Sequence, residues 1–579
     1  MSEIHGPGGP LPPIPDNLTV VQFMLDHHHT SRPPVKQSNA WLIEDATERR
    51  ITLDEIRTRV YGLANALSSL WGIKEDDVVC IFSPNHVDYA ISVRAVHRLG
   101  ATLTTSNPAF TADELEYQLT KTKAKAMIVH PLNLKVALDV AQSTGIPNDR
   151  IVVFDDQQGD LTGPYPRISE LVADGLSKPP AFVERKLKPG EGKTKLAFLS
   201  LSSGTTGRPK AVCIPHHSPI ANVIQMAHLA NQQIAPWEKR AYRPGDIAMA
   251  LLPFYHIYGL VVIMHFAIFY GMTLVVIPKF NFVDMLKSIE RHRINYIPVV
   301  PPIVVMLCKH PAVKDHDLSS LRTMKSGSAP LTAEVIRQLS VKLPHLSIGQ
   351  SYGMTETCTT VTFPQLEQKI GTPGSAGRLL PGVIARVIDP DGNLLGYGQP
   401  GQLVVYSPAN SLGYLNNEQA TKETFVDGWI YTGDEVIINE QADVFVVDRL
   451  KELIKVKGFQ VAPAELEGHL LDHPDVSDVC VVGIPDEYSG EVPLAFVVPS
   501  SRAVERMEKD QAEIANIKAS LKTHVAAAKV HYKHLAGGVE FIDAIPKNPS
   551  GKLLRRFLRD RAKKMQMEGK LSPVVKARL

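Results

Sequence analysis

The first half of the chain alternates short, continuously apolar runs with amphipathic stretches. Val78–Ser83 has the composition of a buried strand, and His86–Leu99 carries its apolar residues at helical spacing. Thr111 to Glu114 spell a capping box, which predicts the start of a helix. Lys125–His130 then returns to an apolar run. This alternation is typical of a parallel sheet covered by helices.

Two further apolar runs, Leu196–Ser202 and Ala250–Phe254, extend the pattern. The second lies in a stretch between Asp246 and Lys279 that contains no charged residue and is long enough to cross roughly 30 Å of hydrocarbon. However, Pro253, His256, Gly259, His265 and Gly271 interrupt it, and its end is rich in β-branched residues. We therefore expect a buried strand, helix and strand here, and no transmembrane segment.

The pattern of apolar and turn-forming residues changes after about residue 380, where Gly, Pro and Asp turns separate short apolar runs. The runs at 382–389, 401–407 and 443–448 predict a β-rich subdomain. The chain after Asp448 has a pattern of its own. We expect strands at 479–484 and 494–499, a helix with Ile514, Ile517 and Leu521 on one face, a strand at Val539–Ile542 and a basic helix from Leu553.

These patterns predict an α/β protein with a large multi-subdomain N-terminal body, built from layered α/β sheets and a β-rich subdomain, and a small α+β C-terminal domain. We expect a flexible Pro/Gly leader over residues 1–17, the body over 18–448, the C-terminal domain over 449–570 and a tail over 571–579.

Composition limits the classes of function. The 579 residues include 62 Lys and Arg against 60 Asp and Glu, so the net charge of +2 does not favour a nucleic-acid partner. From Arg449 onward there are 22 basic and 17 acidic residues, an excess that suits phosphate handling. The five cysteines are scattered without a CxxC pair, which indicates a reducing compartment and neither a disulfide framework nor a thiolate zinc site.

The segment Leu201 to Lys210, LSSGTTGRPK, follows a predicted strand and has the composition of a phosphate-binding loop. Its glycines let backbone N–H groups turn toward an anion, its hydroxyls donate hydrogen bonds, and Lys210 adds positive charge. The spacing is not that of the Walker loop. By composition alone, a surface turn is nearly as good an interpretation.

Several other motifs have simpler interpretations. The GxGxxG at Gly396 precedes a strand, so no helix N-terminus is available for a dinucleotide. The GxSxG around Ser351 precedes β-branched residues rather than the helix that a hydrolase elbow needs. The three histidines from His27 to His29 are expected in a solvated turn, and His256, among aromatics, resembles a structural histidine.

Five ordered strings identify a family resemblance: SSGTTGRPK from Ser202, YGMTE from Tyr352, YTGD from Tyr431, DRLKELIKVKGFQVAPAELE from Asp448 and PKNPSGKLLRR from Pro546. Together they resemble the acyl-adenylate-forming enzymes, in the branch of 4-coumarate–CoA ligase and luciferase. The resemblance covers nearly the whole chain after the leader. It implies an acyl-CoA ligase that forms an acyl-AMP from a carboxylic acid and ATP, then passes the acyl group to coenzyme A.

The resemblance implies roles for the nucleotide-binding residues. The phosphate loop would consist of Ser202, Ser203, Gly204, Thr205, Thr206, Gly207 and Lys210. Gln350, Ser351 and Tyr352 would line the adenine pocket, Thr355 would contact the α-phosphate, and Glu356 would hold Mg²⁺. Asp434 would bind the ribose with help from Arg449. Lys552 would bridge the acid and the phosphate in the first half-reaction.

The second half-reaction and the acid have their own implied residues. Rotation of a mobile C-terminal domain at the hinge, Lys451, would replace Lys552 with the segment that begins at Lys455. Lys455 and Gln460 match positions important to catalysis, and Lys279, Lys457 and Gly458 resemble contacts of coenzyme A. His256 becomes a gate between the acyl pocket and the thiol. The pocket would be lined by Tyr258, Val262, Gly327, Ser328 and Phe363, which suggests an aryl or medium-chain acid.

The chain departs from the family pattern at Ala211, Ser351 and Gln402, where the family often has Gly, Gly and Glu. The alternatives within the same fold are an oxygenase like luciferase, which nothing in the sequence favours, and a noncatalytic binding relative. A noncatalytic relative would be expected to lack Glu356, Asp434 or Lys552, and all three are present.

The last three residues, Ala577, Arg578 and Leu579, resemble the tripeptide that a peroxisomal import receptor reads. We therefore expect a peroxisomal location, with the cytoplasm as the alternative.

Overall fold

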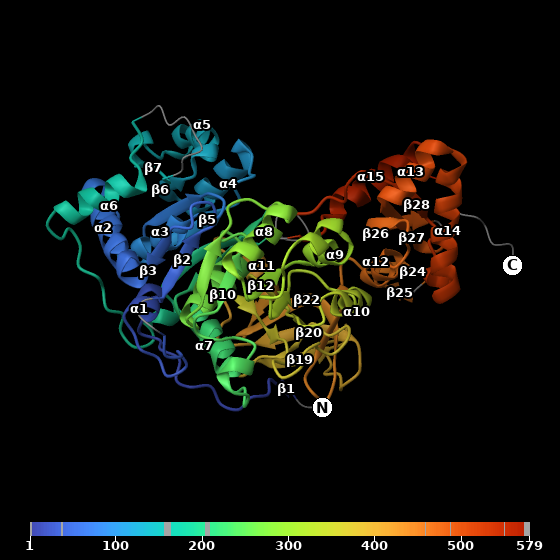
Figure 1. Cartoon of the computed structure of the whole chain (residues 1–579), viewed down its shortest axis with the longest axis horizontal. Coiled ribbons are helices and arrows are strands. Elements are labelled where there is room, and N and C mark those ends of the chain that lie inside the picture. Colours follow the sequence, from blue (N-terminus) through green and yellow to red (C-terminus); the bar gives the residue numbers. More distant parts are fainter. Residues whose placement is uncertain are drawn as a thin grey trace.

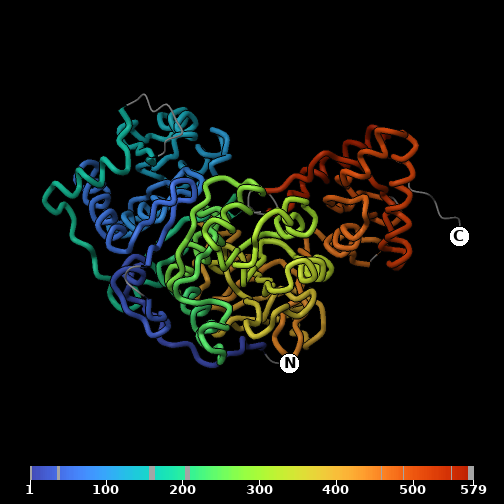
Figure 2. The backbone as a smooth tube through the Cα atoms, viewed as in Figure 1, coloured from blue at the N-terminus to red at the C-terminus, as the bar shows by residue number. Residues whose placement is uncertain are grey.

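Three large sheets form the N-terminal body, and a fourth sheet belongs to a smaller C-terminal domain set to one side of it (Figure 1). The computed structural model describes residues 3–35, 39–155, 164–202, 209–457, 459–486, 488–548 and 551–571. The backbone trace in Figure 2 shows the same division between body and C-terminal domain.

The first sheet has six strands in the order β7-β6-β4-β5-β8-β9, all parallel except β9. Its strands are β4 (Val78–Phe82), β5 (Thr102–Ser106), β6 (Ala124–Val129), β7 (Ile151–Val153), β8 (Leu196–Ser202) and β9 (Lys210–Pro215). The helices that follow its early strands are α3 (Val87–Arg98), α4 (Ala112–Thr122) and α5 (Leu134–Thr144). The predicted capping box is present, because Thr111 and Glu114 each bond to the other's backbone.

The second sheet has seven strands in the order β14-β13-β12-β10-β11-β2-β3, parallel except for β3. They are β2 (Ala40–Glu44), β3 (Arg50–Thr52), β10 (Ile247–Ala250), β11 (Thr273–Val276), β12 (Tyr296–Val299), β13 (Thr323–Ser326) and β14 (Ser347–Gln350). Its associated helices are α7 (His217–Asn231), the π-helix η5 (Tyr258–Ala267), α8 (Phe282–His292), α9 (Pro301–Lys309) and α10 (Ala333–Lys342).

The third sheet is antiparallel, in the order β1-β19-β20-β22-β21, with β23 also paired to β22. It comprises β1 (Ile4–His5), β19 (Ile384–Ile388), β20 (Gly401–Tyr406), β21 (Phe425–Val426), β22 (Trp429–Ile438) and β23 (Val444–Arg449). Two short ribbons, β15 (Gly353–Met354) with β16 (Thr359–Thr360) and β17 (Thr362–Phe363) with β18 (Arg378–Leu379), lie between the second and third sheets in the sequence.

The remaining helices of the body are α1 (Val20–Leu25), α2 (Leu53–Trp71), α6 (Ile168–Ser177) and α11 (Glu418–Thr424). The C-terminal domain contains β24 (Ile454–Val456), β25 (Phe459–Val461), β26 (Val476–Asp486), β27 (Gly490–Pro499) and β28 (Gly538–Phe541), with α12 (Pro463–Leu471), α13 (Ser501–Lys509), α14 (Ala512–Ala528) and α15 (Arg555–Met567). Separate apolar clusters fill it, one on each face of its sheet.

Most predicted elements are confirmed within a few residues. The uncharged stretch after Asp246 forms β10, η5 and β11, as expected, and none of the helices in the described part of the chain is long and apolar enough to cross a membrane. The strand predicted over Ala250–Phe254 is wrong in its bounds, since β10 ends at Ala250. Pro253 lacks the N–H that a continued ladder would need.

The N-terminal residues differ from the predicted flexible leader. Ile4 and His5 pair with Ala385 and Ile384 at the edge of the third sheet, and Glu3 forms an ion pair with Arg386. This strand could not be predicted from the sequence, because two residues show no periodicity and their partner is distant in sequence.

Two smaller expectations also fail. His29 is 5% exposed rather than solvated, because its imidazole bonds to the carbonyl of Pro13 and accepts from the backbone of Ser31. The buried face of α14 is formed by Ile517, Leu521 and Val525, and Ile514 lies at its solvent edge with 39% of its surface exposed.

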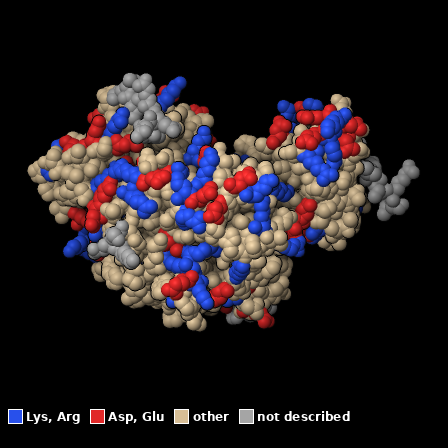
Figure 3. Space-filling model, in the orientation of Figure 1, with Lys and Arg blue, Asp and Glu red and all other residues tan. Residues whose placement is uncertain are grey.

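The C-terminal domain contacts the body through α9 and α10. The Lys309 ammonium at the end of α9 donates to the carbonyls of Leu471 and Val476 at 3.3 and 3.1 Å. The backbone of Gly468 in α12 approaches Thr332 so closely that an added Cβ would lie 2.5 Å from its methyl group. On the face shown in Figure 3, basic and acidic side chains are interspersed over both parts.

Candidate active site between the body and the C-terminal domain

The segment that follows β14 supplies the first group of predicted site residues. The Gln350 side chain exchanges two hydrogen bonds with the backbone of Leu331, at 2.7 and 2.8 Å, and so fixes the strand end. The backbone N–H of Ser351 donates to Ser326, whereas the buried Ser351 hydroxyl has no hydrogen-bond partner among the described residues. No helix follows Ser351, so the hydrolase elbow is not formed in this segment.

Tyr352, Asp434 and Arg449 form one hydrogen-bonded and ionic group. The Tyr352 hydroxyl lies 2.6 Å from Oδ2 of Asp434, and Arg449 Nε lies 3.3 Å from Oδ1. Asp434 and Arg449 are directly opposite each other on β22 and β23. Burial lowers the pKa of the Arg449 guanidinium, but Asp434, Tyr352, Glu356 and Glu452 together outweigh burial, so the pKa is raised. The carboxylate is 4% exposed and is held ready to accept further hydrogen bonds.

Glu356 is also buried, at 4% exposure. The hydroxyl of Tyr414 donates to its Oε1 at 2.8 Å, and the backbone N–H of Ser411 donates to its carbonyl. Tyr414, which sequence reasoning missed, also lies under Lys210, whose Nζ is 4.7 Å from the ring centroid. Ser202 and Lys210 are paired on β8 and β9. The base of the predicted phosphate loop therefore lies close to Glu356.

The rest of that loop, Ser203, Gly204, Thr205, Thr206 and Gly207, lies outside the described residues. Thr355 is described, and its carbonyl accepts from the Ser411 hydroxyl at 3.3 Å.

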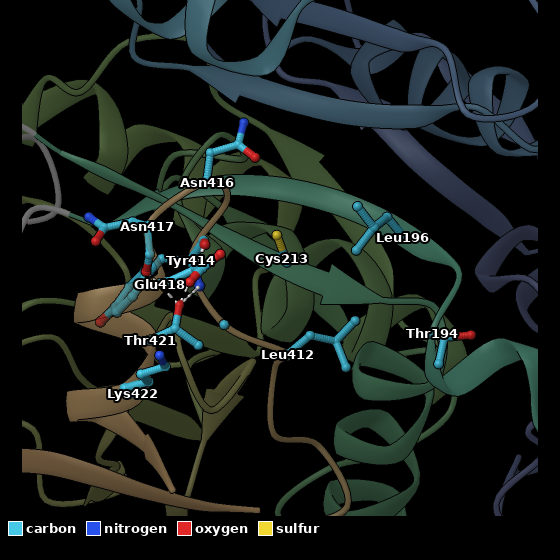
Figure 4. Close-up of a pocket in the computed structure, with 11 residues that line it drawn as sticks. Thr194, Leu196, Cys213, Leu412, Tyr414, Asn416, Asn417, Glu418, Thr421 and Lys422 are labelled. Atoms are coloured by element: carbon cyan, nitrogen blue, oxygen red, sulfur yellow. Dashed lines mark hydrogen bonds between the residues drawn. The ribbon is translucent and has the colours of Figure 1, made fainter.

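A hollow of about 550 Å³ is lined by residues of the 412–422 segment together with Leu196 and Cys213, among others (Figure 4). Tyr414 also lines it, and its backbone is fixed by the Thr421 hydroxyl. Within the described part of the chain, none of the site residues predicted from the sequence is among the residues that line this hollow.

Lys552 of the C-terminal domain lies near Arg449, Asp434 and Glu356. Burial and the charge of Arg449 lower the pKa of its ammonium to about 8, while Asp434 and Glu356 act in the opposite direction. Burial lowers the pKa of His256 to about 4, with a further contribution from Lys552. Gly551 packs against Val300 of the body, where an added Cβ would lie 2.8 Å from a methyl group. The lysine loop is therefore docked on the body.

The five residues predicted to line the acyl pocket occur on η5, after β13 and on β17. Tyr258 is 6% exposed and contacts Gly327, where an added Cβ would lie 2.9 Å from the tyrosine ring. Val262 and Phe363 are fully buried, and Ser328, with a φ of 70°, is exposed. The tyrosine hydroxyl donates to the carbonyl of Lys325 at 3.1 Å.

Lys325 was not predicted from the sequence, although it lies only two positions before Gly327, the first predicted pocket residue of this segment. It is 1% exposed, and its ammonium lies 3.7 Å from the centroid of the Phe363 ring. Its Nζ has no hydrogen-bond partner in the described ranges, and burial lowers its pKa well below the ordinary value. A buried lysine without a hydrogen-bond partner is costly, and this Nζ contacts the face of the Phe363 ring.

The residues predicted for the second half-reaction, which are the catalytic Lys455 and Gln460 and the coenzyme A contacts, are not brought to the buried group. Lys455 and Gln460 oppose each other on the β24–β25 hairpin and are exposed, as are Lys457 and Lys279. Gly458 lies outside the described residues. The predicted hinge, Lys451, is exposed in the turn after β23. Its neighbour Glu452 forms an ion pair with Arg559 of α15.

Comparison with known proteins gives matches over nearly the whole chain. Residues 30–415 match the AMP-binding enzyme family, and residues 465–552 match the AMP-binding enzyme C-terminal domain. The chain is 34% identical to 4-coumarate–CoA ligase 5 of Oryza sativa subsp. japonica, over 94% of this chain and 95% of the relative. It is 36% identical to the acyl-CoA ligase AFT1-1 of Alternaria alternata, over 95% and 96%.

Solved structures agree. The anthranilate CoA ligase AuaEII in complex with anthranoyl-AMP superposes with a TM-score of 0.79 at 23% identity, covering 96% of this chain and 99% of that one, which shows the fold. ATP-bound MatB from Rhodopseudomonas palustris gives a TM-score of 0.78 at 25% identity, covering 95% and 99%.

Proposed function

The chain belongs to the AMP-binding enzyme family and is an AMP-forming acid–CoA ligase. We propose which of its residues act in each of the two half-reactions. In the first half-reaction a carboxylate oxygen attacks the α-phosphorus of ATP, and pyrophosphate leaves. In the second, the sulfur of coenzyme A attacks the acyl carbon, AMP leaves, and the thiol proton is released. Both steps need charge neutralisation and positioning more than covalent help from the protein.

The observation that carries the proposal is the docking of Lys552 beside Arg449, Asp434, Glu356 and His256. An ammonium there neutralises the repulsion between a carboxylate and a phosphate. Asp434, fixed by Tyr352 and Arg449, accepts hydrogen bonds from the ribose hydroxyls. The arrangement thus suits the first half-reaction. Lys210 and the loop before it would hold the outer phosphates.

Glu356 fits a magnesium site of the kind that ATP brings with it. No group of three or more His, Cys, Asp or Glu side chains suited to a metal occurs in the described part of the chain, so an all-protein cage is not offered there. Mg²⁺ is commonly held by one or two carboxylates together with phosphate oxygens and water. When bound, the ion would neutralise phosphate charge, while Tyr414 keeps the Glu356 carboxylate in place.

The second half-reaction requires a different set of residues. We propose that rotation near Lys451 withdraws Lys552 and brings Lys455, Lys457 and Gln460 to the body. Their exposure in the present arrangement leaves them free for this exchange. His256, neutral at physiological pH because burial lowers its pKa to about 4, would lie between the acid and the incoming thiol. Lys279 is exposed and available to a phosphate of coenzyme A.

The acid is proposed to be an aryl or medium-chain acid that carries an oxygen acceptor away from its reacting carboxylate. The support is Lys325, whose buried ammonium has no hydrogen-bond partner within the described residues and lies against Phe363. A hydroxyl, keto or second carboxylate oxygen would supply that partner.

A panel of acids tests this assignment. Pyrophosphate release with ATP, Mg²⁺ and coenzyme A should be faster for acids with a remote oxygen than for unsubstituted acids of equal length. Lys325→Met should remove this preference and leave the KM for ATP unchanged. If the wild-type enzyme prefers unsubstituted acids, the proposed class of acid is rejected. If it releases no pyrophosphate with any acid, the proposed roles of the residues in the two half-reactions are rejected as well.

We also propose that the enzyme is imported into peroxisomes. The support is the C-terminal Ala577, Arg578 and Leu579, which lie outside the described residues. A fluorescent protein fused before residue 1 should give a punctate peroxisomal pattern that becomes diffuse when Leu579 is deleted. An unchanged pattern would reject the import tripeptide.

A further inference from the structure

The segment η5, which carries Tyr258 and Val262, is a π-helix of ten residues, all of them buried. In a π-helix the hydrogen bonds join residues i and i+5, one residue further apart than in an α-helix. Such helices are rare, and they occur frequently at functional sites. In a π-helix the carbonyl of residue 260 pairs with the N–H of residue 265. Here the same carbonyl has a second donor, since Nδ1 of His265 lies 2.6 Å from the oxygen of Leu260.

This contact fixes the protonation of His265. A carbonyl can only accept, so Nδ1 carries the hydrogen and the other ring nitrogen, Nε2, presents a lone pair. Burial lowers the pKa of the ring to about 3, with a contribution from Arg94, so the imidazole is neutral at physiological pH. Nε2 is buried and has no hydrogen-bond partner among the residues described. This nitrogen can therefore accept a hydrogen bond.

Arg94 on α3 is the matching donor. Its side chain is fully buried, and Nη1 bonds to the carbonyl of Ala90 at 2.8 Å. Within the described ranges, its Nε and Nη2 have no hydrogen-bond partner. His97 provides a second lone pair nearby. Its Nε2 donates to the carbonyl of Ala197 on β8 at 3.0 Å, so its unpartnered Nδ1 is an acceptor, and Arg94 contributes to lowering its pKa as well.

The donors and acceptors of this buried group are complementary. Arg94 offers N–H groups at Nε and Nη2, and His265 and His97 each offer a lone pair, while none of these atoms has a hydrogen-bond partner among the described residues. Arg94 and His97 both lie on α3, His265 lies on η5, and His97 also bonds to a carbonyl of β8. The next residue of η5 after His265, Phe266, packs toward the predicted pocket, since its ring lies 6.2 Å from that of Phe363.

We propose that His265, through the hydrogen bond from its Nδ1 to the carbonyl of Leu260, is a positioning residue that fixes the π register of η5 and thereby sets the shape of the acyl pocket at Tyr258 and Val262. An α-helical register would remove the extra residue and turn the first part of the segment by about 100° relative to Ala267. Tyr258 would then lose its place against Gly327. The inference rests on the proposed function, because it assigns these residues to the acid site.

An isomeric pair of substitutions tests the role of the hydrogen bond. The amide nitrogen of Asn can occupy the position of Nδ1, whereas that of Gln corresponds to Nε2. His265→Asn should therefore keep the KM for the acid within about threefold of wild type, and His265→Gln should raise it about tenfold, as expected for one lost hydrogen bond. The KM for ATP should change less than twofold in both, since β22 and β23 are untouched.

His265→Leu, which has no donor, should raise the KM for the acid like His265→Gln and should change the order of preference in a series of acids of increasing length. Equal KM values and equal preference for the Asn and Gln variants would overturn the proposal, even if the Leu variant does not fold. So would a crystal structure of His265→Gln with η5 unchanged. Failure of the proposed function is distinguishable, because wild type would then release no pyrophosphate with any acid.

Discussion

The hydroxyl of Tyr352 and the carboxylate of Asp434 lie 2.6 Å apart, although 82 positions separate the two residues. The tyrosine comes from the turn after β14 in the second sheet, and the aspartate from β22 in the third. Their contact therefore joins the sheets at the predicted ribose site. Arg449, on the neighbouring strand, holds the other carboxylate oxygen at 3.3 Å.

Tyr352→Phe should weaken nucleotide binding and leave the acid site intact. The phenyl ring keeps the packing, but Asp434 loses one of its two fixed partners, and a hydrogen bond to a charged group contributes about 1.5–3 kcal/mol. We expect the KM for ATP to rise at least about tenfold. Initial rates of pyrophosphate release measure this effect. Tyr406→Phe, on the exposed side of β20, is the matched control, and equal KM values in the two variants would refute the ribose assignment.

The first half-reaction should lose activity above about pH 8. Lys552 must be protonated to offset negative charge, and burial together with Arg449 lowers its pKa to about 8. Because a lysine loses its charge as pH rises through its pKa, kcat/KM for ATP should fall about tenfold per pH unit above that value. Lys552→Arg should move this fall to higher pH, since a guanidinium stays protonated. An identical alkaline limb in both enzymes would assign the titration to another group.

Tyr414→Phe should raise the Mg²⁺ concentration needed for half-maximal pyrophosphate release. Without the hydroxyl at 2.8 Å, the Glu356 carboxylate is no longer fixed beside Lys210. We expect an increase of about three- to tenfold, the effect of losing one hydrogen bond. Tyr397→Phe, at an exposed position, serves as the control. A magnesium requirement equal to that of wild type would show that the tyrosine does not orient the metal ligand.

Lys309→Ala should slow the first half-reaction several-fold without slowing the second. Lys309 donates to the carbonyls of Leu471 and Val476, and so helps to hold the C-terminal domain where Lys552 is docked. Lys342 is the matched control, because it donates to the carbonyl of Cys308 within the body. The two half-reactions are measured separately, as pyrophosphate release and as thioester formation from supplied acyl-AMP. Equal slowing of both would contradict a role in domain position.

Helices and strands could be predicted from short stretches of sequence, whereas contacts between residues distant in sequence could not. The cap at Thr111 and the apolar run of β4 are encoded within a few residues, so their positions could be read from the sequence. Lys325 could not, since its burial depends on Phe363, which is far away in sequence and reaches it only through the fold. The docking of Ile4 on β19 was missed for the same reason.

The site residues also fall into two groups, those that the sequence motifs identify and those that only the structure identifies. The family strings named Asp434, Glu356 and Lys552, but not the groups that orient them. Tyr414 carries no signal of its own in the sequence, and its importance follows from the distance to Glu356. Arg94 and His265 look like isolated polar residues in apolar segments, and only the structure shows that their unpaired nitrogens are complementary.

The most direct test of the account compares two lysine variants in the two half-reactions. The proposed division assigns Lys552 to acyl-AMP formation and Lys455 to the thioester step. Lys552→Ala should abolish pyrophosphate release, yet convert supplied acyl-AMP and coenzyme A to the thioester at close to the wild-type rate. Lys455→Ala should show the reverse pattern. Equal loss of both half-reactions in the Lys552→Ala enzyme would contradict the central claim.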